Sequence, residues 1–261
     1  MNLSLEGKLA VVCGSTQGIG LAIAEELALL GANCILMARN EASLKEAISK
    51  LDSSNRQLHE YRVADFSKSN QVKNEIEEIV AAQPVHILVN NTGGPPAGPI
   101  FTAKEEEFLN AFQQHVICNH ILTQAVVPGM KEAGYGRIIN IISTSVKIPL
   151  KNLGVSNTIR GAVASWAKTM ANELGQFNIT VNNILPGSIT TGRLNSIMEK
   201  TAERRNTTKE VIEKEMIEEI PMKRIGDVAE IAAVAAFIAS PAASYVNGVS
   251  IPVDGGRTGS I

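Results

Sequence analysis

Short strand-like runs, most of them apolar, alternate along the chain with longer segments in which apolar residues recur every three or four positions. A short apolar run is typical of a buried strand, whereas the longer spacing indicates a helix with one apolar face. The predicted strands occupy residues 9–13, 33–38, 57–63, 87–90, 137–142, 180–185 and 249–253. The predicted helices occupy residues 18–30, 41–51, 68–82, 103–132, 155–176 and 227–239. This alternation predicts an α/β fold: a single doubly wound parallel sheet with helices on both faces.

The segment from 188 to 226 departs from the alternation. It follows the sixth predicted strand and carries many charges between 201 and 219, and Pro221 comes shortly after this charged part. The charges alone indicate a solvated helical insert. Because the segment begins at the carboxyl end of the sheet, where α/β proteins bind ligands, we favour a lid. No linker, repeat or low-complexity stretch interrupts the rest, so residues 1–261 are expected to form one domain.

Composition argues against several classes of protein. The chain has 261 residues, 44% of them hydrophobic, and a formal net charge of -2. This length can bury one sizeable core, and the near-neutral charge argues against a nucleic-acid or membrane partner. Cys13, Cys34 and Cys118 lie in apolar patterns without metal-ligand spacing, which predicts buried free thiols and no metal site. Without a secretory signal pattern, and with no apolar stretch longer than 231–239, we expect a cytoplasmic protein.

The first predicted strand leads into a glycine-rich turn, and a helix begins at once after it. Gly14, Gly18 and Gly20 allow a tight turn and a close approach of the backbone to a phosphate. The free N–H groups of the helix then face the anion. A glycine triplet alone is often only a turn, but the strand before it and the helix after it favour a dinucleotide site. The residues expected to contact the dinucleotide here are Gly14, Ser15, Thr16, Gln17, Gly18, Ile19 and Gly20.

Three further motifs follow along the chain. They are Asn90-Asn91-Thr92-Gly93, Pro186-Gly187-Ser188-Ile189-Thr190-Thr191 and Val253-Asp254-Gly255-Gly256. With the Gly-x3-Gly-x-Gly turn they resemble the short-chain dehydrogenase/reductase family, in particular its 3-oxoacyl-ACP (acyl carrier protein) reductases, over nearly the whole chain. The resemblance implies a Rossmann-like oxidoreductase domain that transfers a hydride between a nicotinamide and a carbonyl or alcohol. It also implies cofactor contacts at Asp65, Phe66, Asn91, Thr92, Gly93, Arg160, Pro186, Gly187, Ile189 and Thr191.

The residues after the second predicted strand bear on the choice of cofactor. An acidic residue there would bind the adenosine ribose of NAD, but the sequence is Ala38-Arg39-Asn40. The guanidinium of Arg39 can pair with the 2′-phosphate of NADP(H) through two charge-assisted hydrogen bonds. An exposed arginine at the start of a helix is the alternative. We therefore expect NADP(H), with NAD(H) less favoured.

The catalytic positions depart from the family pattern. In the family, a serine after the fifth strand is followed by a Tyr-x-x-x-Lys motif on the next helix. Ser143 fits the serine, but Ser156 and Arg160 occupy the tyrosine and lysine positions, and the chain contains no Tyr-x-x-x-Lys. A neighbouring cation lowers the tyrosine pKa, which is ordinarily near 10, whereas a serine normally needs a separate base. Arginine can bind the nicotinamide ribose but stays charged.

A further candidate lies on the helix predicted at 103–132. His115 aligns with an asparagine that relays protons in the family. Histidine ordinarily titrates near neutral pH and is suited to proton transfer. A histidine packed beneath the sheet is the alternative. The candidate catalytic residues are therefore Ser143, Ser156, Arg160 and His115.

Three functions are compatible with this sequence. The one we favour is an NADP(H)-dependent oxidoreductase that acts on a small carbonyl or alcohol through an atypical site. The alternatives are a cofactor-binding sensor or scaffold without turnover, and a non-redox enzyme such as a lyase, because one fold serves several chemistries. The helices at 103–132 and 155–176 resemble those that pair in family dimers, and the C-terminal segment resembles a second interface. Since they carry apolar residues such as Ile117, Ile121, Val163 and Trp166, we expect a homo-tetramer or dimer.

Overall fold

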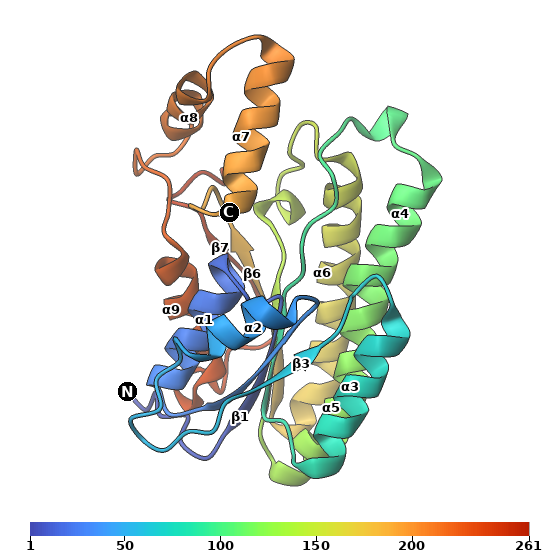
Figure 1. Ribbon diagram of the computed structural model, residues 1–261, viewed down its shortest axis with the longest axis vertical. Coiled ribbons are helices and arrows are strands. Elements are labelled where there is room, and N and C mark those ends of the chain that lie inside the picture. The colour runs from blue at the N-terminus through green and yellow to red at the C-terminus, as the bar shows by residue number, and fades with distance from the viewer. Residues whose placement is uncertain (261) are drawn as a thin grey trace.

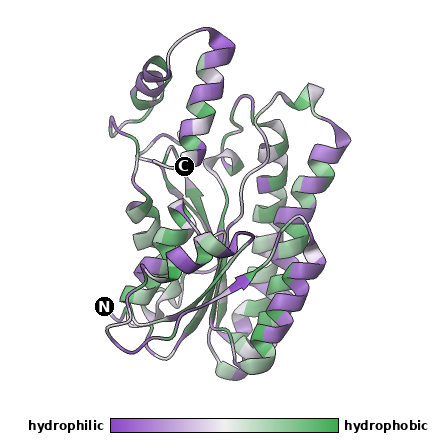
Figure 2. Cartoon of the chain, viewed as in Figure 1, coloured by the Kyte–Doolittle hydropathy of each residue, from purple (hydrophilic) through white to green (hydrophobic). Residues whose placement is uncertain are grey.

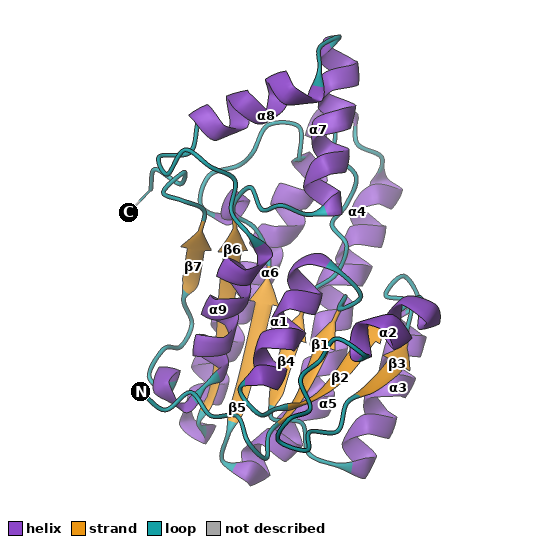
Figure 3. Cartoon of the chain, turned by 60° about the vertical axis from the view of Figure 1, so that its left-hand side comes forward, coloured by secondary structure: helices purple, strands orange, loops and turns teal. Residues whose placement is uncertain are grey.

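The computed structural model describes residues 1–260, and seven strands in this part of the chain form one sheet (Figures 1 and 3). The strands are β1 (Leu9–Cys13), β2 (Asn33–Ala38), β3 (Glu60–Val63), β4 (Ile87–Asn90), β5 (Gly136–Ile141), β6 (Ile179–Pro186) and β7 (Ser250–Val253). All neighbours are parallel, in the order β3-β2-β1-β4-β5-β6-β7. The predicted doubly wound parallel sheet is confirmed. The chain order reverses between β1 and β4, which is where such sheets bind ligands.

Helices cover both faces of the sheet. They are α1 (Gly18–Leu29), α2 (Glu41–Ile48), α3 (Ser69–Ala82), α4 (Glu105–Phe112), α5 (Cys118–Ala133), α6 (Gly154–Leu174), α7 (Gly192–Arg205), α8 (Lys209–Glu218) and α9 (Val228–Ala239). In Figure 1, α1, α2 and α9 lie on one face and α3, α5 and α6 on the other.

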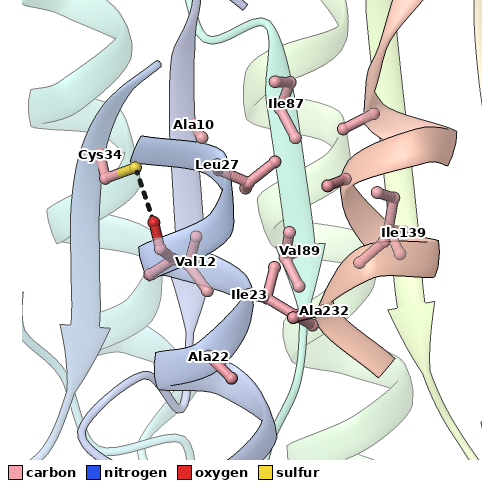
Figure 4. Packing of buried hydrophobic residues seen from close by; sticks show 14 of the residues in the cluster. Ala10, Val12, Ala22, Ile23, Leu27, Cys34, Ile87, Val89, Ile139 and Ala232 are labelled. Carbon is pink, nitrogen blue, oxygen red and sulfur yellow. Dashed lines mark hydrogen bonds between the residues drawn. The ribbon is translucent and has the colours of Figure 1, made fainter. Parts of the chain in front are cut away.

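Successive side chains of β1 explain the two layers, because they alternate between the faces of a sheet. Val12 packs in the same buried cluster as Ile23 of α1 and Ala232 of α9 (Figure 4). Val11 belongs to the opposite cluster, with Ile76 of α3 and others from α5 and α6. Both faces of β1 are therefore buried, as its continuous apolar sequence predicts.

The helix predicted at 103–132 is interrupted. It consists of α4, a π-helical turn η2 (Gln113–Ile117) and α5. The apolar spacing continues through the turn, so the sequence gives no sign of it. π-helical turns within helices are frequently found at functional sites. Strand β3 begins at Glu60, three positions after the predicted start at 57.

The segment that departs from the alternation is helical, as predicted. Its helices α7 and α8 lie beyond the carboxyl ends of the strands, and Figure 2 shows that α7 is largely hydrophilic. The two helices pack on each other through a small cluster of Met198, Ala202 and Ile212 that is separate from the cores beside the sheet. Arg205 and Glu215 form an ion pair between them. The pair of helices is thus attached to the sheet mainly at its ends.

The three cysteines are buried and free, as predicted. Burial raises the pKa of Cys34 to about 12 and that of Cys118 to about 11, so both thiols stay protonated at neutral pH. Residues 1–260 contain no group of three or more His, Cys, Asp and Glu side chains able to hold a metal ion. Over the same residues, no helix combines the length and the apolar character needed to cross a membrane.

Candidate active site

The glycine turn between β1 and α1 is closed against the end of β4. Gly14 and Gly18 have φ angles of 59° and 58°, in the left-handed region that favours glycine. A Cβ atom on Gly14 would lie 2.5 Å from the carbonyl oxygen of Asn91, and one on Gly20 would lie 2.2 Å from that of Gly14. The side chain of Asn91 donates hydrogen bonds to the carbonyls of Cys13 and Gly14, at 3.2 and 3.1 Å. The turn therefore tolerates no larger residue at these two positions.

A cleft opens over this turn, and we call it the glycine-turn cleft. Its walls come from the carboxyl ends of four neighbouring strands and from the start of α7. The sequence-predicted residues that line it are Gly14, Thr16, Gln17, Gly18, Ile19, Gly20, Arg39, Asp65, Phe66, Asn91, Thr92, Gly93 and Thr191. Ser15 was predicted to contact the dinucleotide, but its side chain is buried and does not line this cleft.

The far end of the glycine-turn cleft carries both charges expected of an adenosine site. The pKa of Asp65 is lowered mainly by a hydrogen bond from the backbone of Ser67, and the charge of Arg39 adds to this effect. Arg39 itself is exposed. Asn40 caps α2 by accepting a hydrogen bond from the Ser43 backbone at 2.9 Å. A tight glycine turn at one end and a free guanidinium at the other fit a dinucleotide that carries a 2′-phosphate.

A second cavity, of about 250 Å³, adjoins the first, and we call it the serine cavity. It brings together three of the four candidate catalytic residues: Ser143 after β5, and Ser156 and Arg160 on α6. Ser156 and Arg160 are one helical turn apart and are both buried. Ser143 accepts a hydrogen bond from the backbone of Ser145 at 3.1 Å, which fixes its position. Arg160 was also predicted to contact the cofactor, and the other predicted cofactor residues that line the cavity are Ile19, Asn91, Thr92, Gly93, Pro186, Gly187, Ile189 and Thr191.

His115, the fourth candidate, lies behind the wall of the serine cavity. It is 2% exposed and comes from the π-helical turn η2. Its Nδ1 atom lies 2.7 Å from Oγ1 of Thr92, and Thr92 lines the cavity. Burial, assisted by the charges of Arg160 and Arg193, lowers the pKa of His115 to about 2. The imidazole is therefore neutral at pH 7, unlike an ordinary histidine, which titrates near neutral pH.

Comparison with known proteins identifies the family. The pattern of a family described as enoyl-(acyl carrier protein) reductase matches residues 14–258. The 3-oxoacyl-[acyl-carrier-protein] reductase FabG of Pseudomonas aeruginosa is 34% identical over 258 residues, which cover 97% of this chain and 98% of that protein. The chain belongs to the short-chain dehydrogenase/reductase family.

Solved structures of NADPH-dependent reductases agree with the short-chain fold. The L-sorbose reductase of Gluconobacter frateurii, solved with NADPH and L-sorbose, has a TM-score of 0.93 and 30% identity, with both chains covered fully. The NADPH-dependent reductase YwfH, involved in bacilysin biosynthesis, has a TM-score of 0.91 and 29% identity, covering 97% of this chain and 99% of its own. The predicted family and enzyme class, an oxidoreductase, are confirmed.

Arg193 is a residue of the short-chain site that our sequence reasoning missed. It lies in the first turn of α7, lines both cavities, and donates hydrogen bonds to the carbonyls of Gly94 and Pro95, each at 2.9 Å. The contact joins segments about a hundred residues apart, at the Gly94–Pro99 loop and the start of α7. Its position directly after the Pro-Gly-x-Ile-x-Thr motif was the only available signal.

Proposed function

We propose that the protein is an NADP(H)-dependent oxidoreductase that interconverts a carbonyl and an alcohol without the usual tyrosine. The observation that carries this proposal is the continuity of the two cavities. Asn91, Thr92, Gly93, Thr191 and Arg193 line both of them, so one extended molecule can reach from Arg39 to Ser143. A dinucleotide has this extended shape. The bound NADPH of the sorbose reductase supports the choice of cofactor.

Residues of the glycine-turn cleft would hold the cofactor. The backbone N–H groups at the start of α1 bind its pyrophosphate, and Arg39 binds the 2′-phosphate. Asp65 and Phe66 line the glycine-turn cleft and would border the adenine, and the segment from Pro186 to Thr191 lines the serine cavity and would border the nicotinamide. When bound, the cofactor gives a hydride to a carbonyl carbon, or takes one from an alcohol carbon.

The residues of the serine cavity orient the substrate and move the proton. The hydroxyls of Ser143 and Ser156 donate hydrogen bonds to the carbonyl oxygen, which becomes more basic as the carbon is reduced. The oxygen takes its proton from Thr92, Thr92 takes one from Nδ1 of His115, and the imidazole takes one from water at Nε2. A neutral imidazole can donate from one nitrogen and accept at the other, so it relays a proton without becoming charged. In the reverse direction the alcohol loses the same proton and a hydride.

The test combines binding with turnover. The protein is titrated with NADPH and NADH, and is then mixed with ketones, aldehydes and acyl thioesters while the absorbance of the reduced nicotinamide is followed. We expect tighter binding of NADPH and its oxidation by at least one carbonyl class. NADPH binding without oxidation by any substrate would favour the sensor or scaffold, and substrate conversion without a redox change would favour a lyase. Absence of NADPH binding would refute the cofactor assignment.

We also propose that the protein is a homo-oligomer, a dimer or a tetramer. Members of the short-chain family commonly associate through the helices equivalent to α4, α5 and α6. Large apolar side chains of α4 are exposed in this chain, among them Leu109 and Phe112. Exposed apolar side chains that lie together mark contacts between proteins.

A further inference from the structure

The serine cavity is lined by arginines and by no acidic residue. Arg160, Arg193 and Arg257 contribute to its walls, while Asp and Glu do not. Arg257 is bonded to Glu219. Within residues 1–260, neither Arg160 nor Arg193 has a carboxylate within 4 Å. The cavity therefore has an uncompensated positive charge.

Arg160 is the more unusual of the two. Its residue is only 8% exposed, and one terminal nitrogen donates to the carbonyl of Ile141 at 2.9 Å. Its Nε atom is buried without a hydrogen-bond partner. Burial, and then the charge of Arg193, lower its pKa to about 10, so it is still charged at neutral pH. A buried charge that is paired only with a neutral carbonyl is costly, and a bound anion would offset that cost.

The phosphates of the cofactor are poorly placed to supply this anion. The pyrophosphate is expected at the N-terminus of α1, and the 2′-phosphate at Arg39, both in the glycine-turn cleft. Arg160 lines only the serine cavity, together with Ser143 and Ser156, and does not line the glycine-turn cleft. Arg193 lies at the junction of the two cavities and is exposed. The nicotinamide ribose expected beside Arg160 carries no charge, so the anion must come from the side where the substrate reacts.

We propose that Arg160, with Arg193 at the cavity edge, binds an oxyanion of the substrate, which is thus an anionic carbonyl compound: an oxo carboxylic acid or an oxo phosphate ester. This inference rests on the proposed function, because it names the substrate class of that site. The rest of the substrate is apolar. The cavity is also lined by apolar side chains from the loop before α6 and from α7 and α8: Leu150, Leu153, Leu194, Ile197 and Met216.

An anion at Arg160 also changes His115. The charges of Arg160 and Arg193 contribute to the low pKa of the imidazole, and a negative charge beside them offsets that contribution. Binding of the substrate would therefore raise the pKa of His115. The ring still stays neutral at pH 7, because burial is the larger cause of its low pKa, and the relay through Thr92 remains one of a neutral imidazole.

The experiment measures anion selectivity by calorimetry on the NADP⁺-saturated protein. The probes are 4-methylpentanoate, its uncharged analogue 4-methylpentanamide, and 3-methylbutyl phosphate. We expect at least one anion to bind about tenfold more tightly than the amide, as a charge-assisted hydrogen bond would give. Arg160→Gln should abolish the difference in affinity between the anion and the amide, and Arg160→Lys should retain much of it. The control is Arg204→Gln, which removes an exposed arginine of α7 and should leave the difference unchanged.

The possible results separate the alternatives. A stronger preference for the carboxylate assigns an oxo acid, and one for the phosphate assigns a phosphate ester. Equal binding of all three probes would overturn the proposal, as would selectivity that survives in Arg160→Gln. If Arg160→Gln does not fold, Arg193→Gln and Arg160→Lys are compared instead. Arg193→Gln should lower the selectivity for the anion and Arg160→Lys should retain much of it, and selectivity that is unchanged in Arg193→Gln would overturn the proposal. Titration with NADP⁺ alone tests the proposed function separately, and the probes can then be compared on the cofactor-free protein.

Discussion

The neutral imidazole of His115 depends on residues from three separate elements. Thr92 after β4 holds its Nδ1 atom, while Arg160 on α6 and Arg193 on α7 contribute charges that disfavour the imidazolium. Its ordinary pKa is 6.5, and burial is the largest cause of the fall to about 2. Proton transfer at this site therefore requires the neutral ring to pass a proton on, and it depends on the hydroxyl of Thr92.

The same shift makes the stability of the cofactor-free protein depend on pH. Between pH 2 and pH 6.5 the unfolded chain protonates this histidine and the folded chain does not, so the free energy of unfolding falls as the pH falls below 6.5. From about pH 7.5 to about pH 5, His115 should account for a loss of up to about 2 kcal/mol. Urea unfolding at both values measures it, at fixed protein concentration. His115→Asn should flatten the dependence, and an unchanged slope in that variant would contradict the assignment.

Arg39 gives a second prediction at this scale. Arg39→Ala should weaken NADP⁺ binding by about tenfold and leave NAD⁺ binding unchanged, because only NADP⁺ carries the phosphate. Dissociation constants for both cofactors are measured by titration calorimetry. Arg204→Ala removes an exposed arginine remote from the glycine-turn cleft and is the matched control. Similar affinities of the unmodified protein for NADP⁺ and NAD⁺ would refute the role of Arg39.

Single residues of the site were predictable where a motif sets the spacing. Ser143, Ser156 and Arg160 were placed by counting from neighbouring motifs, and the structure brings them to one cavity. The sequence did not predict the contact of Thr92 with His115 or the contact of Arg193 with Gly94. Each of these contacts joins elements that are distant in the chain, and neither leaves a periodic signal.

At the scale of elements, the strands were predictable because their burial depends on their own sequence. Both ends of β1, β2 and β4 agree with the prediction, since each run is apolar and is followed by a glycine or a polar residue. The π-helical turn η2 was not predictable. One extra residue per turn does not disturb the apolar face on either side, yet the turn contains His115.

The glycine turn gives a prediction for an element. Gly20→Ala should lower the free energy of unfolding by about 1–3 kcal/mol, because its Cβ would meet the Gly14 carbonyl oxygen at 2.2 Å. It should also weaken NADP⁺ binding by opening the turn. Gly192→Ala is the matched control, since a Cβ there meets nothing within 4 Å. Urea unfolding compares the two variants, and equal stabilities would show that the turn yields to the extra methyl group.

For the whole molecule, the arrangement of apolar surface decides how copies associate. Of the residues expected at an interface, Val163 is 1% exposed and packs with Ile142 and Leu185, so it belongs to the core of the same chain. Trp166 and Ile121 are partly buried against the cluster around α5 and α6. On α4, by contrast, two large apolar side chains face solvent, with Leu109 69% and Phe112 43% exposed. Burial inside one chain and burial between chains give the same sequence pattern, so only the structure separates them.

These side chains lead to a prediction about assembly. Light scattering at micromolar concentration should show a dimer or a tetramer, because association removes the apolar surface of α4 from water. Leu109→Ser combined with Phe112→Ser should shift the population towards smaller species without lowering the NADP⁺ affinity of each chain. Leu58→Ser changes a leucine in the loop before β3 that is 77% exposed, and it should leave the mass unchanged. A monomeric unmodified protein would contradict the prediction, and an unchanged mass in the double variant would place the interface elsewhere.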